Sequence, residues 1–297
     1  MSAAVEATSQ STANANPGSA TGPVVRPKTS GWQLFKDVLN HGGPGYLQFA
    51  ITNICNADCD FCGFARSKFD PKARRSVTLQ QAKDVVDIAK RNHIGYLLFV
   101  GGEPMAHKEL RPMVRYAAER GIHPMICTNG GLWTEENMRG LVDDGLTSVI
   151  MSIDAHDIPK HEQNRGLPDV CRKIKRANEF FHGVGIQTTA SITASRLIDD
   201  YDKLPAFLES LDFRSCTFSY PLTSLASSYL SFSDSGLVNF SKDELIALFE
   251  KIKQIVSAPA CPAPSSKVNG VLVVTWSSTS STSSADARFF RCASQGT

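Results

Sequence analysis

Three cysteines stand close together near residue 60 of the chain. Cys55, Cys59 and Cys62 are separated by three and by two residues, and they follow an apolar stretch at residues 46–52. Thiolates at this spacing suit a soft metal, and cysteine thiolates hold iron–sulfur clusters. A closed zinc or cluster site normally takes four protein ligands, whereas this motif supplies three. The fourth ligand therefore either comes from a distant part of the chain or is not protein.

The cysteines belong to a repeated alternation of apolar strands and amphipathic helices. Apolar runs predict strands at residues 46–52, 95–100, 122–127, 148–154, 185–193 and 216–220. Helical spacing and capping residues predict helices at 31–39, 78–92, 108–120, 134–144, 168–183, 202–211 and 242–256, with Pro168 in the first turn of its helix. Six strand–helix repeats with near-continuous apolar strands indicate an α/β fold, in which helices cover a parallel sheet.

Polar or glycine-rich clusters follow four of the expected strands. They are the cysteine loop, residues 101–104, residues 128–130 and Asp154. Because sites in parallel α/β folds form at the carboxyl ends of the strands, we expect these clusters to converge. Ser152 and Asp154 alternate along their strand and therefore share one face.

The order of these motifs resembles the radical S-adenosylmethionine (SAM) superfamily. The cysteine motif, with Phe61 before its last cysteine, is followed by Gly-Gly-Glu-Pro at 101–104, Thr-Asn-Gly at 128–130 and Ser-Ile-Asp at 152–154. Residues 161–166 are similar to the His-x4-Gly stretch of the branch that contains the molybdenum-cofactor and pyrroloquinoline-quinone biosynthesis enzymes. The resemblance covers roughly residues 45–256.

The resemblance implies a partial (β/α)6 barrel of the TIM-like, radical SAM type. It implies a [4Fe–4S] cluster on Cys55, Cys59 and Cys62, with the amino and carboxylate groups of SAM on the open iron. Reductive cleavage of SAM would give a 5′-deoxyadenosyl radical that abstracts hydrogen from an unidentified small molecule or peptide. An electron donor such as flavodoxin or ferredoxin is an implied partner. The cofactor supplies the hard chemistry, and the protein positions atoms and excludes water.

The same resemblance assigns candidate roles to residues that follow the first three strands. Backbone groups of Gly101, Gly102 and Glu103 would bind the methionyl ammonium of SAM, since glycine allows a close approach of the backbone. Main-chain atoms near Phe61 are candidates for the adenine edge, and Asn129 is a candidate for the same cavity.

Further candidates stand on the fourth and fifth strands and just beyond them. Ser152 and Asp154 would bind the ribose hydroxyls or the methionyl carboxylate, and Arg165 is a further candidate for that carboxylate through a charge-assisted hydrogen bond. Thr189 or Ser191 on the fifth strand would reach the adenine edge. No residue is assigned as a catalytic acid, base or nucleophile.

Composition limits the other classes of partner. A net charge of +2 gives no overall electrostatic footprint for nucleic acid or an anionic membrane, and no apolar run approaches the ~20 residues of a membrane span. The N-terminus lacks the basic start and apolar core of a signal peptide, and the eight cysteines do not follow a disulfide framework, so we expect a cytoplasmic protein.

The two ends of the chain differ in composition from its centre. Residues 1–30 are small and polar and predict a disordered tail. Residues 31–256 form the expected core domain, with the motifs in 45–256. Residues 257–297 are rich in Ser, Ala, Pro and Thr and are interpreted as a low-complexity extension, with a truncated or frame-shifted C-terminus as a hypothesis.

Two other classes of function compete with the enzyme. The chain could be a non-catalytic iron–sulfur or zinc-binding protein, or a degraded radical SAM enzyme. Metal analysis separates these alternatives, because about four irons indicate a cluster and one zinc ion indicates the zinc protein.

Overall fold

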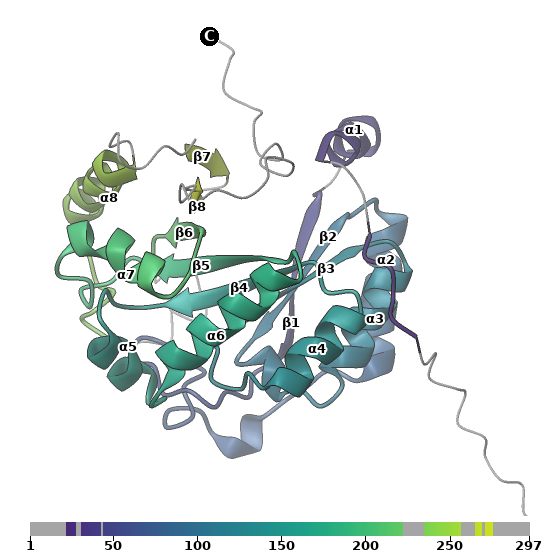
Figure 1. The fold of residues 1–297 in the computed structure, drawn as a ribbon, viewed down its shortest axis with the longest axis horizontal. Helices are drawn as coiled ribbons and strands as arrows, with labels where there is room; N and C mark the ends of the chain where they lie inside the picture. The colour runs from purple at the N-terminus through teal and green to yellow at the C-terminus, as the bar shows by residue number, and fades with distance from the viewer. Residues whose placement is uncertain are drawn as a thin grey trace, which may run out of the picture.

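The computed structural model (Figure 1) describes residues 22–27, 31–42, 44–221, 235–256, 265–268 and 271–275. Its strands join in one sheet in the order β1-β2-β3-β4-β5-β6-β8-β7. They are β1 (Tyr46–Thr52), β2 (Tyr96–Gly101), β3 (His123–Thr128), β4 (Ser148–Ile153), β5 (Gln187–Thr193), β6 (Ser215–Ser219), β7 (Ser265–Val268) and β8 (Val271–Thr275). Strands β1 to β6 pair in parallel, each with the next in sequence, whereas β8 pairs antiparallel with β6. This confirms the predicted α/β fold of partial-barrel type.

Helices precede, connect and follow the parallel strands, as Figure 1 shows. They are α1 (Gly31–His41), α2 (Leu79–Arg91), α3 (Leu110–Glu119), α4 (Glu135–Asp143), α5 (Ile158–Arg165), α6 (Val170–Gly183), α7 (Leu204–Ser210) and α8 (Lys242–Val256), with 3-10 turns η1 (Pro71–Ala73), η2 (Pro104–Ala106) and η3 (Tyr201–Lys203). Side-chain caps set several of the starts. Thr78 and Gln81 form a reciprocal capping box at α2, and Thr134 and Asn137 form one at α4, each worth about 1 kcal/mol.

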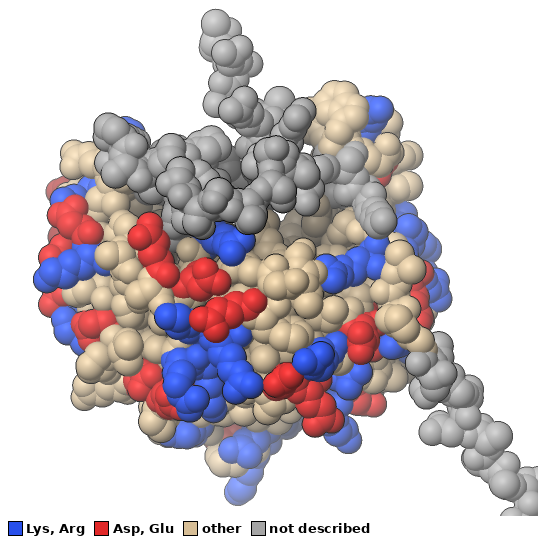
Figure 2. All heavy atoms as spheres, in the orientation of Figure 1, with Lys and Arg blue, Asp and Glu red and all other residues tan. Residues whose placement is uncertain are grey.

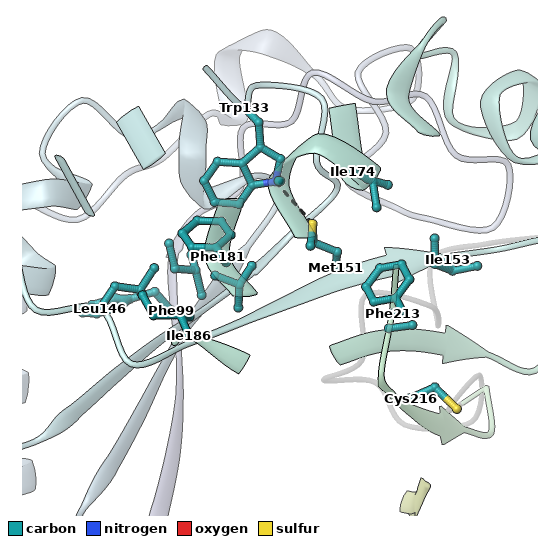
Figure 3. Close-up of a cluster of buried hydrophobic side chains, with 14 of the residues drawn as sticks. Phe99, Trp133, Leu146, Met151, Ile153, Ile174, Phe181, Ile186, Phe213 and Cys216 are labelled. Atoms are coloured by element: carbon teal, nitrogen blue, oxygen red, sulfur yellow. Dashed lines mark hydrogen bonds between the residues drawn. The ribbon is translucent and has the colours of Figure 1, made fainter. Parts of the chain in front are cut away.

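One continuous hydrophobic core lies between the strands and the helices that cover them. On β4 and β5 every second residue is fully buried, so that Met151 and Ile153 contribute to the core while Ser152 is half-buried on the opposite face of the sheet. Figure 3 shows how this core is packed. The indole of Trp133 donates to the sulfur of Met151 at 3.3 Å and meets the ring of Phe181 edge-on, with 5.2 Å between centroids. The opposite face of the sheet is left for half-buried side chains.

Helix α5 is absent from the predicted elements. Its sequence, Ile-Pro-Lys-His-Glu-Gln-Asn-Arg, has no apolar period, and the two side chains that it buries are His161 and Arg165. Pro168 also lies outside its predicted place, because α6 begins at Val170, two residues later. Gly166 ends α5 in a left-handed conformation, with φ of 57°.

The described parts of the two ends differ from the expected tail and extension. Val24 donates to the carbonyl of Asp143 at 2.7 Å, and Arg26 donates to that of Val184 at 3.0 Å, so residues 22–27 lie along the barrel. Strands β7 and β8 lie within the expected low-complexity segment and extend the sheet beyond β6. The remainder of both segments is outside the described residues, and the domain boundaries stay predictions.

Within the described ranges, no helix combines the length and apolarity that a membrane crossing requires.

Candidate functional site

The three cysteines occupy the loop that follows β1. Cys59 is buried, and Cys55 and Cys62 are half-buried. The amide of Ala57 donates to the sulfur of Cys55 at 3.4 Å, and the amide of Cys62 donates to the carbonyl of Cys59 at 3.2 Å. These hydrogen bonds hold the three cysteines in one short loop after the carboxyl end of β1.

Burial and mutual proximity shape the acidity of the three thiols. Burial raises the pKa of Cys55 to about 11 and that of Cys59 to about 12, and the neighbouring thiols contribute to both increases. The guanidinium of Arg165 opposes the increase at each of the three cysteines. Because a metal binds thiolates, loading this site must release protons, and a nearby fixed cation favours that step.

The number and type of the ligands bear on which metal group the three cysteines could hold. A zinc ion needs ligand atoms at about 2.0–2.3 Å from one centre. Among the described residues no three His, Cys, Asp or Glu side chains gather in such a way. In a [4Fe–4S] cluster each thiolate binds a different iron, so its ligands stand farther apart. Three cysteine thiols on one loop can each bind a different iron, so this donor set fits the cluster.

Gly101 and Gly102 bring the end of β2 into direct contact with the cysteine loop. The amides of Gly102 and Glu103 donate to the carbonyls of Thr52 and Ile54, both at 2.7 Å. A Cβ atom at position 101 would lie 2.1 Å from the Thr52 oxygen, and one at position 102 would lie 2.4 Å from the Ile54 oxygen. Only glycine fits this approach. Because an ammonium only donates hydrogen bonds, the backbone groups of this turn that could bind it are carbonyl oxygens.

Glu103 anchors this turn from inside the protein. Its carboxylate is fully buried and accepts hydrogen bonds from the Thr128 hydroxyl at 2.7 Å, the Asn129 amide at 2.7 Å and the Met105 amide at 2.9 Å. Burial raises the pKa of Glu103, and the three donors oppose that shift. The side chain therefore ties the end of β2 to the end of β3, and its predicted contribution to SAM binding lies in its backbone.

A buried ion pair forms at the end of β4. Asp154 and Arg165 are 2% and 6% exposed, and the Arg165 Nη2 lies 2.6 Å from the Asp154 Oδ1. The Nε of Arg165 has no hydrogen-bond partner. A buried N–H without a partner is costly, so this atom points to an acceptor that a ligand would supply. The carboxylate of SAM, predicted to meet Arg165, is such an acceptor.

Helix α5 joins this ion pair to the cysteine loop. Asn164 donates to Asp154 Oδ2 at 2.9 Å and accepts from the amide of Asp60 at 3.3 Å. The carbonyl of Arg165 accepts from the amide of Asp58 at 2.7 Å. His161 accepts from the amide of Asp154 through Nδ1 at 3.2 Å. The His-x4-Gly stretch therefore holds the end of β4 and the cysteine loop in one arrangement.

The remaining candidates occupy the same edge of the sheet in different ways. Ser152 and Ser191 are opposite each other on β4 and β5, both half-buried on the face away from the helices. Thr189 is engaged with Ser215 at 2.9 Å, which leaves Ser191 as the better placed of the two alternatives. Asn129 donates to Asn56 at 2.8 Å, beside Cys55.

Phe61 takes a different place from the other candidates. Its side chain is 5% exposed and packs with Val238, Leu197 and Leu237 in a separate small cluster. Its main-chain role toward adenine stays a prediction.

Sequence reasoning missed two residues that the structure places in the site. Asn164 bridges Asp154 and the cysteine loop, and Asn56 pairs with Asn129. Each stands next to a residue that was singled out, Asn164 beside Arg165 and Asn56 beside Cys55. A polar residue next to a motif residue was therefore the sequence feature that could have identified Asn164 and Asn56.

The chain matches the family profile described as "Radical SAM superfamily" over residues 49–198. This range contains the three cysteines, the buried ion pair and the glycine turn, and it spans half of the chain. The chain belongs to the radical SAM superfamily. Its cofactors are those of the family, a [4Fe–4S] cluster and SAM, and the thiols and the unpartnered guanidinium nitrogen described above fit them.

Similar proteins confirm the expected branch and the fold. The chain is 28% identical to "AdoMet-dependent heme synthase" of Oleidesulfovibrio alaskensis, over 60% of this chain and 45% of that protein. It is 24% identical to "PqqA peptide cyclase" of Granulibacter bethesdensis, over 78% and 58%. Among solved structures, Streptococcus suis SuiB bound to its precursor peptide SuiA superposes with a TM-score of 0.58 at 17% identity, over 76% of this chain and 50% of SuiB. The chain spans less than half the length of the first curated relatives it matches.

Proposed function

We propose that the chain is a radical SAM enzyme that acts on a small molecule or a peptide in a biosynthetic reaction. The observation that carries this proposal is the contact between the three-cysteine loop and Arg165. The amide of Asp58 in that loop donates to the Arg165 carbonyl at 2.7 Å, and the buried Arg165 Nε has no partner. When bound, the cluster would supply an electron to the sulfonium of SAM, giving a 5′-deoxyadenosyl radical that removes hydrogen from the substrate.

The residues of the chain would hold and orient these groups. Cys55, Cys59 and Cys62 would bind three irons. Carbonyl oxygens of the 101–103 turn would accept from the methionyl ammonium of SAM, and Arg165 would donate to its carboxylate. These two contacts face opposite charges of the same amino acid, so together they fix its orientation.

The adenosine part of SAM would extend along the ends of β4 and β5. Ser152 and Ser191 would donate to or accept from its hydroxyls and ring nitrogens, and Asn129 and the main chain near Phe61 would border the adenine. Asp154 holds Arg165 through the 2.6 Å ion pair, which supports a positioning role besides its predicted contact with ribose.

The class of substrate follows the relatives. One matched protein is named as a peptide cyclase, and a structural neighbour is described as bound to a precursor peptide. A peptide or small-molecule substrate is consistent with both. A one-electron donor such as flavodoxin or ferredoxin and a cytoplasmic location complete the proposal.

Anaerobic reconstitution tests this function. The chain, supplied with iron and sulfide and then with dithionite and SAM, should contain about four irons and release 5′-deoxyadenosine. Cys59→Ala should abolish both, while Cys216→Ala, which alters a buried cysteine of the core, should retain both. An intact cluster without 5′-deoxyadenosine would refute the enzyme, and one bound zinc ion would favour the zinc-binding alternative.

A further inference from the structure

A dense group of cations follows the cysteine loop. Residues 66–75 carry Arg66, Lys68, Lys72, Arg74 and Arg75, against a single acidic residue within the segment, and all five cations are exposed. We call these five side chains the basic face. Figure 2 shows blue atoms projecting at the lower edge of the molecule, where Figure 1 places this part of the chain.

The charge of the basic face is not neutralised by ion pairs. In the described part of the chain, none of its five cations lies within 4.0 Å of a carboxylate oxygen. Their hydrogen bonds go to backbone carbonyls instead: Arg66 donates to Asn56 at 3.2 Å, and Arg75 to Arg74 at 2.7 Å. Asp58 faces the segment, and the Ser67 hydroxyl, helped by the charge of Arg66, holds its pKa below the usual range. The five positive charges are therefore exposed and have no carboxylate ion-pair partner among the described residues.

The basic face borders a cluster ligand. The side chain of Asn53, two residues before Cys55, donates to the carbonyl of Ala73 at 3.0 Å and accepts from the amide of Arg75 at 2.7 Å. A small hollow opens beside this connection. It is lined by Asn53, Cys55, Arg66, Arg74 and the rings of Phe64 and Phe69. The half-buried Cys55 thus shares the lining of this hollow with cationic and aromatic side chains.

We propose that the basic face is the docking surface for a small acidic one-electron carrier protein of the flavodoxin type. This inference rests on the proposed function, which requires an electron to enter the cluster. On docking, the reduced flavin of the carrier would give up one electron and a cluster held by the three cysteines would gain it. No bond is made or broken, and no further reactant is needed.

The position of the charge favours an electron carrier over other acidic partners. A surface of one sign attracts an oppositely charged protein and raises its association rate, about 10- to 1,000-fold in favourable cases. Electron transfer needs the two redox centres close together, and the basic face lies against Cys55. The net charge of the whole chain is only +2, so the excess of cations is local rather than a general nucleic-acid footprint.

The test compares two variants that change the net charge by the same amount. Lys72→Glu/Arg74→Glu reverses two charges of the basic face, and Lys175→Glu/Lys242→Glu reverses two exposed, unpaired charges on α6 and α8. The probe is purified flavodoxin. Oxidised flavodoxin is titrated into the chain to measure Kd. Flavodoxin hydroquinone is mixed with the cluster-loaded chain to measure the rate of cluster reduction. Both measurements are made at low salt and at about 0.3 M salt, where screening is strong.

Electrostatic docking predicts about a tenfold or larger loss of affinity and rate for the basic-face variant and less than a twofold change for the control variant. Added salt should weaken flavodoxin binding steeply for the wild type and the control variant, and much less for the basic-face variant. Reduction by dithionite should be equal in all three proteins. Equal losses in both variants, or rates that ignore salt, would overturn the proposal. Loss of binding to an RNA oligomer or an acidic peptide, with flavodoxin binding unchanged, would assign the surface to that partner instead.

A milder variant separates loss of charge from loss of folding, and the dithionite measurement separates failure of the proposed function from failure of the docking proposal. Lys72→Gln/Arg74→Gln removes the charges without adding new ones, and its urea midpoint shows whether folding is preserved. If dithionite and SAM give no 5′-deoxyadenosine, the proposed function fails, whereas flavodoxin Kd values on the chain without iron still decide the docking surface.

Discussion

Glu103→Gln is the substitution whose effect follows most directly from the structure. The Glu103 carboxylate is fully buried, with the Thr128 hydroxyl and the Met105 amide on Oε1 and the Asn129 amide on Oε2. In glutamine one of these oxygens becomes an NH2 group. If the amide oxygen keeps the two donors on Oε1, the new NH2 faces the Asn129 amide, and two donors meet at 2.7 Å.

The expected cost combines a lost bond and an unpaired donor. A hydrogen bond to a charged group contributes about 1.5–3 kcal/mol, and a buried N–H left without a partner costs about 1–3 kcal/mol. Relief of the buried charge offsets part of this sum. We expect Glu103→Gln to lower the free energy of unfolding by about 2–4 kcal/mol. SAM binding should weaken as well, because the carbonyls of the 101–103 turn lose their anchor.

Urea unfolding and equilibrium dialysis with labelled SAM measure the two effects. Glu119→Gln makes the same chemical change at an exposed position of α3 and should leave both quantities unaltered. Ordinary surface substitutions change the free energy of unfolding by about 0.5 kcal/mol or less. If the free energies of unfolding of Glu103→Gln and Glu119→Gln differ by no more than this, the carboxylate does not anchor the turn and the reasoning is wrong.

Two further substitutions test the same edge of the sheet. Burial, reinforced by the charge of Arg165, lowers the pKa of His161 to about 4, so its stabilisation is complete above pH 6.5 and is lost as pH falls toward 4. The loss is up to about 3 kcal/mol, and urea midpoints across this range should fall less steeply for His161→Asn than for wild type. If the urea midpoints of both proteins fall equally with pH, the interpretation of His161 as a neutral buried imidazole is wrong. Gly102→Ala sets a Cβ 2.4 Å from the Ile54 oxygen and should reduce iron content after reconstitution, while Gly183→Ala, with open space around it, should not. Equal iron in both would show that the contact is dispensable.

The sequence determined the elements because their signals are local. Strand and helix periods follow from backbone geometry, and caps such as Thr78 with Gln81 involve residues three apart. For the same reason all six parallel strands were predictable from order and spacing, and the three cysteines stay the predicted cluster ligands. Helix α5 was not, because its buried side chains are His161 and Arg165 and no apolar stripe marks it.

Tertiary structure alone decided how the site is held together. The bond between Asn164 and the amide of Asp60 joins residues 104 positions apart, and no local pattern announces such a pairing. Packing also turned Glu103 inward and left the Nε of Arg165 without a partner. Whether a charged side chain is buried, paired or free depends on which distant groups the fold brings beside it. The sequence therefore predicted the cluster ligands, and the fold decided what surrounds them and which cations lie exposed beside them.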